Sequence, residues 1–565
     1  MKQKIRLTII GVILFLAIAI TAGITMYSKF APSKKVMKLE DYYQTAGDDS
    51  SVVLVLQDKI YEQRGKLIDG QIYVDYDTVV TYFNKRFYWD DNESLLLYTT
   101  PTEIIKTEVG SKDYYINKSK KSMEYAIAKV EDGVVYIALD YVKEYSNLEY
   151  TMYEDPNRVV ITYIFGEDYL FADIKEATQL RYKPSIKGDI LKQMKKGDRV
   201  QIIVDEEEVN KNFTKVITED GIIGYVKNSM TKNSYYEATE SKMKEPEYTS
   251  ITKDHKINMT FHQVTNQTAN NHVLELLGNT KGVTTISPTW FKVSSVEGNV
   301  DSLASETYVQ RAHNYGVEVW ALVDDFTNAI DMSELLSYTS RREKLSNELI
   351  ALAIKYNLDG LNMDFEKIPE AAGKDYIQFL REMSVKCRNN GIILSVDNYV
   401  PSAYTSYYDR EEQGILVDYV ITMAYDEHIN GSDGSGSVAS ISFVSDAVTN
   451  VLKEVPAEKN IIAIPFYTRL WEETADGVTA KAYSMDQAQA ILDQNNVEAT
   501  WDEETKQYYG EYESSGNTYK IWLEEEKSLE EKLKVISENN VAGIASWKLG
   551  LERSNVWSVI LKYVN

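Results

Sequence analysis

One apolar run in the chain carries polar side chains at every second position. The run spans residues 359–366 and contains Asn362, Asp364 and Glu366 among apolar neighbours. In a β-strand, this alternation places the three side chains on one face. Two carboxyl groups on one face raise each other's proton affinity, which keeps a glutamate protonated for general acid catalysis near neutral pH. The run therefore predicts acid–base chemistry centred on Glu366 and Asp364.

The element that must position these groups is a buried strand of a parallel barrel. Between 255 and 565, eight apolar β-like runs alternate with helix-patterned segments. The runs span 257–264, 283–290, 317–323, 358–366, 392–399, 417–425, 461–467 and 541–547. Eight β/α units in about 310 residues predict an α/β fold, a (β/α)8 TIM barrel, whose active site lies at the C-terminal ends of the strands. An open doubly wound sheet is the alternative, but it would not need eight strands.

Packing alone does not account for the carboxylates at the end of the fourth run. Strands of a parallel barrel are usually apolar on both faces, and burying a carboxylate costs several kcal/mol unless something compensates. A structural ion pair or a metal site is the other interpretation of Asp364 and Glu366. The longest gap between runs, 468–540, holds further β-like segments, and we expect an antiparallel insertion after the seventh strand.

Three motifs now identify a family. The run from Asp359 to Glu366 resembles the D-G-x-D-x-D-x-E signature of family 18 glycoside hydrolases, the chitinase-like enzymes, with Asn362 in place of one Asp. Residues 423–426 resemble the M-x-Y-D that ends the sixth strand of the family, and Trp547 stands at the end of the eighth. Residues 287–291 and 547–550 are most similar to the branch that contains spore-cortex and peptidoglycan N-acetylglucosaminidases.

The resemblance implies substrate-assisted retaining hydrolysis, in which the 2-acetamido oxygen of the substrate attacks C1. Glu366 would protonate the leaving glycosidic oxygen and then activate water. Asp364 would orient the acetamido group and Tyr425 would bond its oxygen. The resemblance assigns supporting positions to Asp359, Asn362, Met423 and Asp426, with Asp426 on sugar hydroxyls. Asn362 departs from the family, since it can hydrogen-bond Asp364 but cannot carry charge. The resemblance implies no metal and no cofactor.

Other aromatic residues are candidates for stacking on sugar rings. Trp547 would lie beneath the ring, and Trp290 and Tyr467 are possible platforms, with core packing open for both. For Asp359, a turn or capping role is as open as a direct part in catalysis. A silent glycan-binding protein on the same barrel is the alternative to an enzyme. The intact Glu366 and Asp364 favour the enzyme.

The N-terminus predicts a membrane segment over residues 1–30. No charge occurs between Arg6 and Lys29, and that length suffices to span a bilayer. Basic residues before the segment predict a cytoplasmic N-terminus and an exported remainder. The expected location is thus the bacterial cell membrane, with an extracytoplasmic catalytic domain. A cleaved signal peptide, giving a secreted protein, is the alternative.

Two small β-rich domains precede the barrel. Residues 51–165 contain a run, 73–83, that resembles the N-terminal domain of copper amine oxidases. Residues 174–232 resemble bacterial SH3-like domains, with an LR-x-x-PS start, a KGD-x-V turn and a GYV end. Polar stretches at 29–50 and 231–254 predict linkers.

Composition limits the classes of partner that the protein can bind. The formal charge of −25 disfavours binding to nucleic acid. Cys387 is the one cysteine, which excludes an intrachain disulfide and any site built from several cysteines. The predicted partner is an N-acetylglucosamine-containing polysaccharide, peptidoglycan or chitin. Nothing in the sequence indicates an oligomeric state.

Overall fold

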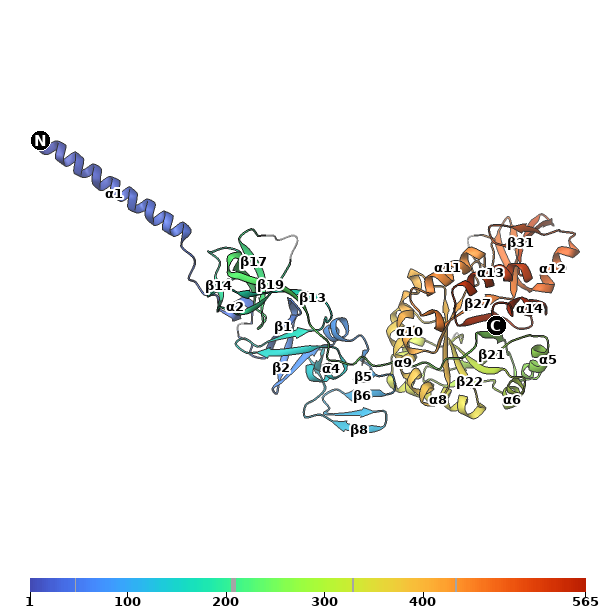
Figure 1. The fold of residues 1–565 in the computed structure, drawn as a ribbon. Coiled ribbons are helices and arrows are strands. Elements are labelled where there is room, and N and C mark those ends of the chain that lie inside the picture. Colours follow the sequence, from blue (N-terminus) through green and yellow to red (C-terminus); the bar gives the residue numbers. More distant parts are fainter. Residues whose placement is uncertain (46, 205–209, 328–329, 432–433, 565) are drawn as a thin grey trace. The chain divides into compact units, whose positions relative to one another are not determined.

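The computed structural model describes residues 1–565 except 46, 205–209, 328–329, 432–433 and 565. The chain divides into two compact units (Figure 1). The smaller unit comprises 1–87, 107–114 and 120–245, and the larger comprises 88–106, 115–119 and 246–565.

The larger unit is built on a closed barrel of eight parallel strands. They are β20 (Ile257–His262), β21 (Thr285–Val293), β23 (Glu318–Asp324), β24 (Gly360–Asp364), β25 (Ile393–Tyr399), β26 (Tyr419–Met423), β27 (Asn460–Pro465) and β33 (Gly543–Trp547). Each pairs in parallel with its neighbours, and β20 closes the ring by pairing with both β21 and β33. The predicted barrel is confirmed.

Helices follow the strands and cover the outside of the barrel (Figure 1). They are α5 (Val273–Gly278), α6 (Glu306–Asn314), α7 (Met332–Leu336), α8 (Thr339–Tyr356), α9 (Gly373–Asn389), α10 (Arg410–Leu416), α11 (Ile441–Val451), α13 (Glu526–Glu538) and α14 (Val556–Ile560). Several begin at side-chain caps; the Ser305 and Ser440 hydroxyls, for example, accept the N–H groups of Tyr308 and Phe443.

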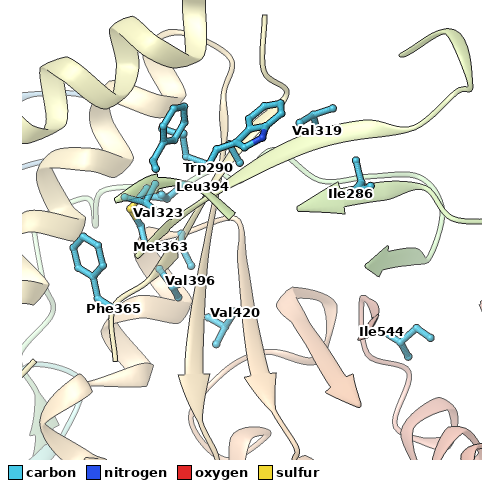
Figure 2. Close-up of a cluster of buried hydrophobic side chains, with 14 of the residues drawn as sticks. Ile286, Trp290, Val319, Val323, Met363, Phe365, Leu394, Val396, Val420 and Ile544 are labelled. Atoms are coloured by element: carbon cyan, nitrogen blue, oxygen red, sulfur yellow. The ribbon is translucent and has the colours of Figure 1, made fainter. Parts of the chain in front are cut away.

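Strand alternation separates two cores. Side chains on the outer face, among them Met363 and Phe365 of the fourth-strand run, pack beneath the helices (Figure 2). There the ring of Phe365 stacks on Phe379 of α9 at 5.8 Å. The inner face holds a smaller cluster that includes Trp320 and Tyr419, stacked at 5.4 Å. The barrel interior is thus filled, and polar groups on inward positions are held within a packed core.

The expected insertion follows the seventh strand. It is a five-stranded antiparallel sheet of β28 (Tyr467–Thr474), β29 (Gly477–Ser484), β30 (Thr500–Asp502), β31 (Gln507–Ser514) and β32 (Asn517–Leu523), with helix α12 (Met485–Gln494) against it. Just after the insertion, Glu524 is buried, and its Oε1 lies 2.8 Å from Nζ of Lys532 in α13.

Residues 88–106 belong to the larger unit and were not expected there. Strand β4 (Phe87–Asp90) brings the Tyr88 hydroxyl to Asp375, at 2.7 Å, beside Arg342 of α8. Arg342 is fully buried and forms an ion pair with Glu382 of α9 at 3.1 Å. Strands β5 (Leu95–Thr99) and β6 (Ile104–Glu108) continue this sheet through β7 (Asp113–Ile116) and β8 (Ser119–Ser122). The expected domain over 51–165 is therefore divided between the two units.

The smaller unit contains helix α1 (Lys2–Phe30) and two seven-stranded sheets. α1 is long and apolar enough to cross a membrane. The first sheet has β1 (Ser51–Leu56), β2 (Lys59–Ile68), β3 (Gln71–Asp75), β9 (Ala128–Glu131), β10 (Val134–Ala138), β11 (Glu149–Tyr153) and β12 (Arg158–Thr162), with α3 (Tyr76–Thr78), a π-helical turn (Val79–Phe83) and α4 (Leu139–Tyr145). The second has β13 (Asp168–Ile174), β14 (Thr178–Arg181), β15 (Ile190–Met194), β16 (Arg199–Ile202), β17 (Phe213–Thr218), β18 (Ile223–Lys227) and β19 (Thr231–Ala238).

Both predicted linkers are partly structured. The first contains α2 (Leu39–Tyr43), whose Tyr43 is buried, and its Met37 N–H donates to the carbonyl of Ile190 at 3.0 Å. The second begins with β19, which pairs antiparallel with β13. Polar composition was misleading here because edge strands and short docked segments expose half of their side chains.

Candidate active site

The end of β24 places the predicted catalytic residues at the mouth of the barrel. Asn362 and Asp364 are buried on the inward face, and Glu366 follows two residues after the strand, half-buried. Asp364 and Glu366 line one cleft of about 560 Å³. Tyr425, Asp426, Met423 and Trp547, which come from the ends of β26 and β33, line the same cleft. The structure therefore brings six of the sequence-predicted residues together.

Burial governs the charge of Glu366. Removal from water raises the pKa of its carboxyl, and the negative charge of Asp426 adds to the rise. Hydrogen bonds from Tyr399 and Asp364 oppose it by favouring the ionised form. A carboxyl with a raised pKa holds its proton at higher pH, as a general acid requires. Asp364 is more deeply buried, and its pKa lies well above the usual range, first because of burial and then because of Asp397.

Asp397, at the end of β25, is a third buried carboxyl in the cleft. Its Oδ2 accepts the amide of Asn362 at 2.6 Å, and the Asn362 oxygen accepts the Ser395 hydroxyl at 2.7 Å. The hydrogen bond that Asn362 could make to Asp364 is made to Asp397 instead. Strand register explains the difference, because β24 and β25 pair Asn362 directly with Ser395, and Asp397 lies two residues farther along the same face.

The backbone that carries Glu366 is held by Asp325, which no motif or pattern in the sequence singled out. The carboxylate of Asp325, just after β23, accepts the N–H of Glu366 at 3.1 Å and of Lys367 at 2.9 Å. Burial raises the pKa of Asp325 to about 6. The Tyr408 hydroxyl also donates to the carbonyl of Phe365 at 2.9 Å. These bonds fix the peptide on both sides of Glu366.

The end of β26 is anchored from the insertion. The carboxylate of Asp426 accepts the Tyr467 hydroxyl at 2.5 Å and the Arg469 guanidinium at 2.6 Å. Tyr467 is 5% exposed and its ring lies 6.4 Å from that of Tyr425. The structure thus places Tyr467 as a support for Asp426 and Tyr425, instead of as a platform that a sugar could reach.

Trp547 lies in the cleft wall, whereas Trp290 does not. The Trp547 ring is partly exposed and lies 5.3 Å from that of Phe261. Trp290 is buried in the outer core (Figure 2), where its indole N–H donates to Asn270 at 2.8 Å. Alternation along β21 explains this position, because Trp290 lies four residues after Ile286, which is also on the outer face. Of the two roles open for Trp290, the structure shows core packing.

Asp359 lies at the opposite end of β24 from the cleft. Its Oδ2 is 2.8 Å from His313 Nε2 and accepts the N–H of Val319 at 2.8 Å. Because it precedes the strand, it cannot meet a substrate held at the strand's C-terminal end. The turn or capping interpretation therefore describes its position.

Comparison with known proteins decides the family. The model of glycosyl hydrolases family 18 matches residues 214–552, more than half of the chain. The chain belongs to glycosyl hydrolase family 18. The model of the copper amine oxidase N-terminal domain matches residues 56–161, as expected from 73–83. No comparison bears on the SH3-like domain, which stays a prediction.

Two relatives of this family 18 chain come from Bacillus subtilis (strain 168). The cortical fragment-lytic enzyme of Bacillus subtilis (strain 168) is 29% identical over 240 residues, covering 41% of this chain and 56% of that enzyme. The uncharacterized glycosylase YvbX of the same strain is 25% identical over 260 residues, covering 44% of this chain and 75% of YvbX. The chain thus covers little more than half of the length of the first relative.

A solved structure supports the fold. The Bacillus cereus spore cortex-lytic enzyme SleL superposes with a TM-score of 0.50 at 19% identity, covering 55% of this chain and 74% of SleL. The barrel and its place in the chain agree with the predicted fold class.

Proposed function

We propose that this protein hydrolyses β-1,4 glycosidic bonds next to N-acetylglucosamine in peptidoglycan, with Glu366 as general acid and base. The observation that carries the proposal is the position of Glu366, half-buried in the cleft with a raised pKa. A group that holds a proton at the mouth of the barrel can give it to a leaving oxygen.

The remaining residues suit substrate-assisted retention. Asp364 adjoins Glu366 and would orient the 2-acetamido group as its oxygen attacks C1 and the glycosidic bond breaks. Tyr425 would bond the acetamido oxygen, and its ring lies against Tyr467, which limits its movement. Trp547 offers a flat apolar face to the sugar. Glu366, now a carboxylate, would take a proton from the water that opens the intermediate.

The substrate class is supported by the relatives and by the N-terminus. One relative is named for cortical fragments and another for spore cortex lysis. We propose that α1 stays attached as an anchor, which would hold the enzyme beside the cell's own wall. Detection of residues 1–30 by mass spectrometry in protein from the membrane fraction would support this, and a mature chain that begins near residue 20 would refute it.

Substitution Glu366→Gln tests the reaction. We expect loss of activity by about 10²–10⁴-fold, because the amide cannot transfer a proton. Full-length protein would be incubated with purified peptidoglycan and with chitin, and products identified by mass spectrometry. Products with N-acetylglucosamine at the new reducing end are expected from peptidoglycan.

Glu370→Gln is the matched control, because it makes the same change at an exposed position four residues away. It should retain wild-type activity. Cleavage after N-acetylmuramic acid would contradict the specificity. Binding of glycan by the wild type without release of reducing ends would favour the silent glycan-binding alternative.

A further inference from the structure

Asp397 of β25 is a buried carboxyl that lines the cleft. We propose that Asp397 is a positioning residue that keeps a shared proton on Asp364, so that Asp364 donates a hydrogen bond to Glu366. The inference rests on the proposed hydrolysis and concerns the same site. Asp397 is 3% exposed and lines the cleft with Asp364 and Glu366.

Hydrogen-bond donors decide which of the two carboxyls carries the charge. Asp397 Oδ2 receives the Asn362 amide at 2.6 Å, and a donor favours the ionised form. Asp364 Oδ1 is buried and has no hydrogen-bond partner among the described residues. Two neighbouring buried carboxyls cannot both ionise cheaply, so the pair shares one proton. The proton therefore resides on Asp364 and the charge on Asp397.

Four acidic side chains act on Asp364. Asp324 and Asp325 face it from the end of β23, Glu366 from its own segment and Asp397 from β25. After burial, these charges all raise the pKa of Asp364. Tyr425 faces the group from β26 and Tyr376 from α9, and both rings are neutral because the same burial and charges raise the pKa of their hydroxyls. Lys292 and Lys367 act on Asp324.

The shared proton has a use in the reaction. Glu366 gives its proton to the glycosidic oxygen, the bond from that oxygen to C1 breaks, and Glu366 is left as a carboxylate. A protonated Asp364 can donate to that carboxylate, which stabilises it when the charge develops. The bond is consistent with the lowering of the Glu366 pKa by Asp364.

The arrangement also accounts for Asn362. Its oxygen accepts the Ser395 hydroxyl and its amide donates to Asp397, so both ends of the side chain are used. An Asp at 362 could accept from Ser395 but could not donate to a charged Asp397. Asn362 and Asp397 therefore act as one unit across two strands.

Single variants of Asn362 and Asp397, and a double variant that exchanges the two side chains, test whether these residues act together. Asp397→Asn alone removes the charge, and we expect kcat to fall about tenfold with KM unchanged, as when an interaction is made only in the transition state. Asp364 would then ionise at lower pH, and Glu366 would lose a donor and gain a negative neighbour. The basic limb of the pH–kcat profile should move upward by about one unit or more.

The double variant Asn362→Asp with Asp397→Asn restores one carboxylate and one amide donor, and should return the profile to that of wild type. Asn362→Asp alone, which leaves two carboxyls without the amide, should not. Activity would be measured as reducing ends released from purified peptidoglycan and from chitohexaose. An unchanged profile in Asp397→Asn, or failure of the folded double variant to restore it, would overturn the inference.

A second readout does not need turnover. Because the pKa of Asp364 is raised in the folded state, its protonated form stabilises the fold at pH values below the usual Asp pKa. This stabilisation is lost as the pH rises. Asp397→Asn should weaken this loss, so the Tm of the barrel should fall less steeply with pH than in wild type. Equal slopes would overturn the inference. If wild type cleaved no glycan, the proposed function would fail while the Tm comparison still decided the role of Asp397.

Discussion

Buried carboxyls in the helix layer differ from those in the cleft. Glu382 is held by the guanidinium of Arg342, and Glu524 by the ammonium of Lys532. Asp364 and Asp397, which are equally buried, each keep one oxygen without a partner among the described residues. A paired carboxylate stabilises the fold by its contacts, whereas an unpaired one costs free energy and persists where it serves chemistry. A cationic partner, more than the degree of burial, therefore distinguishes the structural carboxyls from those of the cleft.

The largest effect should come from breaking a paired group. Arg342→Met leaves Glu382 buried without its cation, and we expect the free energy of unfolding to fall by about 3–5 kcal/mol. Thermal or urea unfolding of the larger unit would measure it. Adding Glu382→Leu should recover much of the loss, because no charge is then left unpaired. A loss below about 1 kcal/mol would show that the pair is not structural.

Removing an unpaired group should have the opposite sign. Asp364→Asn abolishes the ionisation that burial and Asp397 oppose, so the protein should be more stable at pH 7 and lose activity. Wild-type stability falls as pH rises above the usual Asp pKa, because the folded state holds a proton that the unfolded state releases. The gain in Tm should therefore shrink toward pH 4. A lower Tm at pH 7 would contradict the comparison.

The smallest effect belongs to the other end of the same strand. Asp359→Asn weakens one bond to Val319 and one to His313, and we expect a loss of about 1 kcal/mol. The pH–rate profile should stay as in wild type, because Asp359 lies away from the cleft. Urea unfolding and the profile together check both parts. A shifted profile would return Asp359 to the catalytic group.

Local pattern was sufficient for the barrel and for the fourth strand. Alternation in 359–366 correctly separated Met363 and Phe365, which pack outward, from Asn362 and Asp364, which point inward. Eight apolar runs fixed the class of fold because each needs a neighbour on both edges. The family resemblance, and not the apolar runs, assigned Met423, Tyr425, Asp426 and Trp547 to the site, and these four residues line the cleft.

Contacts between strands were beyond the reach of local pattern. The position of Asp397 matters because strand register brings it to Asn362. Asp325 matters because it accepts backbone N–H groups at Glu366 and Lys367. Asp325 carries no signal in its own segment. Two roles were open for Trp290 and for Tyr467, and the structure shows core packing for Trp290 and a hydrogen bond from Tyr467 to Asp426 of another segment. An inward position at the end of a neighbouring strand was the available clue to Asp397.

The docking of residues 88–106 on the barrel has a practical consequence for recombinant work. A fragment that begins at residue 246 keeps the last segment of the larger unit but deletes Tyr88 and Asp90, which bond Asp375 and the first turn of α8. Arg342 would lose one of its partners and a covered face would meet water. We therefore expect the shortest soluble fragment to start before residue 51. A barrel expressed without residues 88–106 should be prone to aggregate.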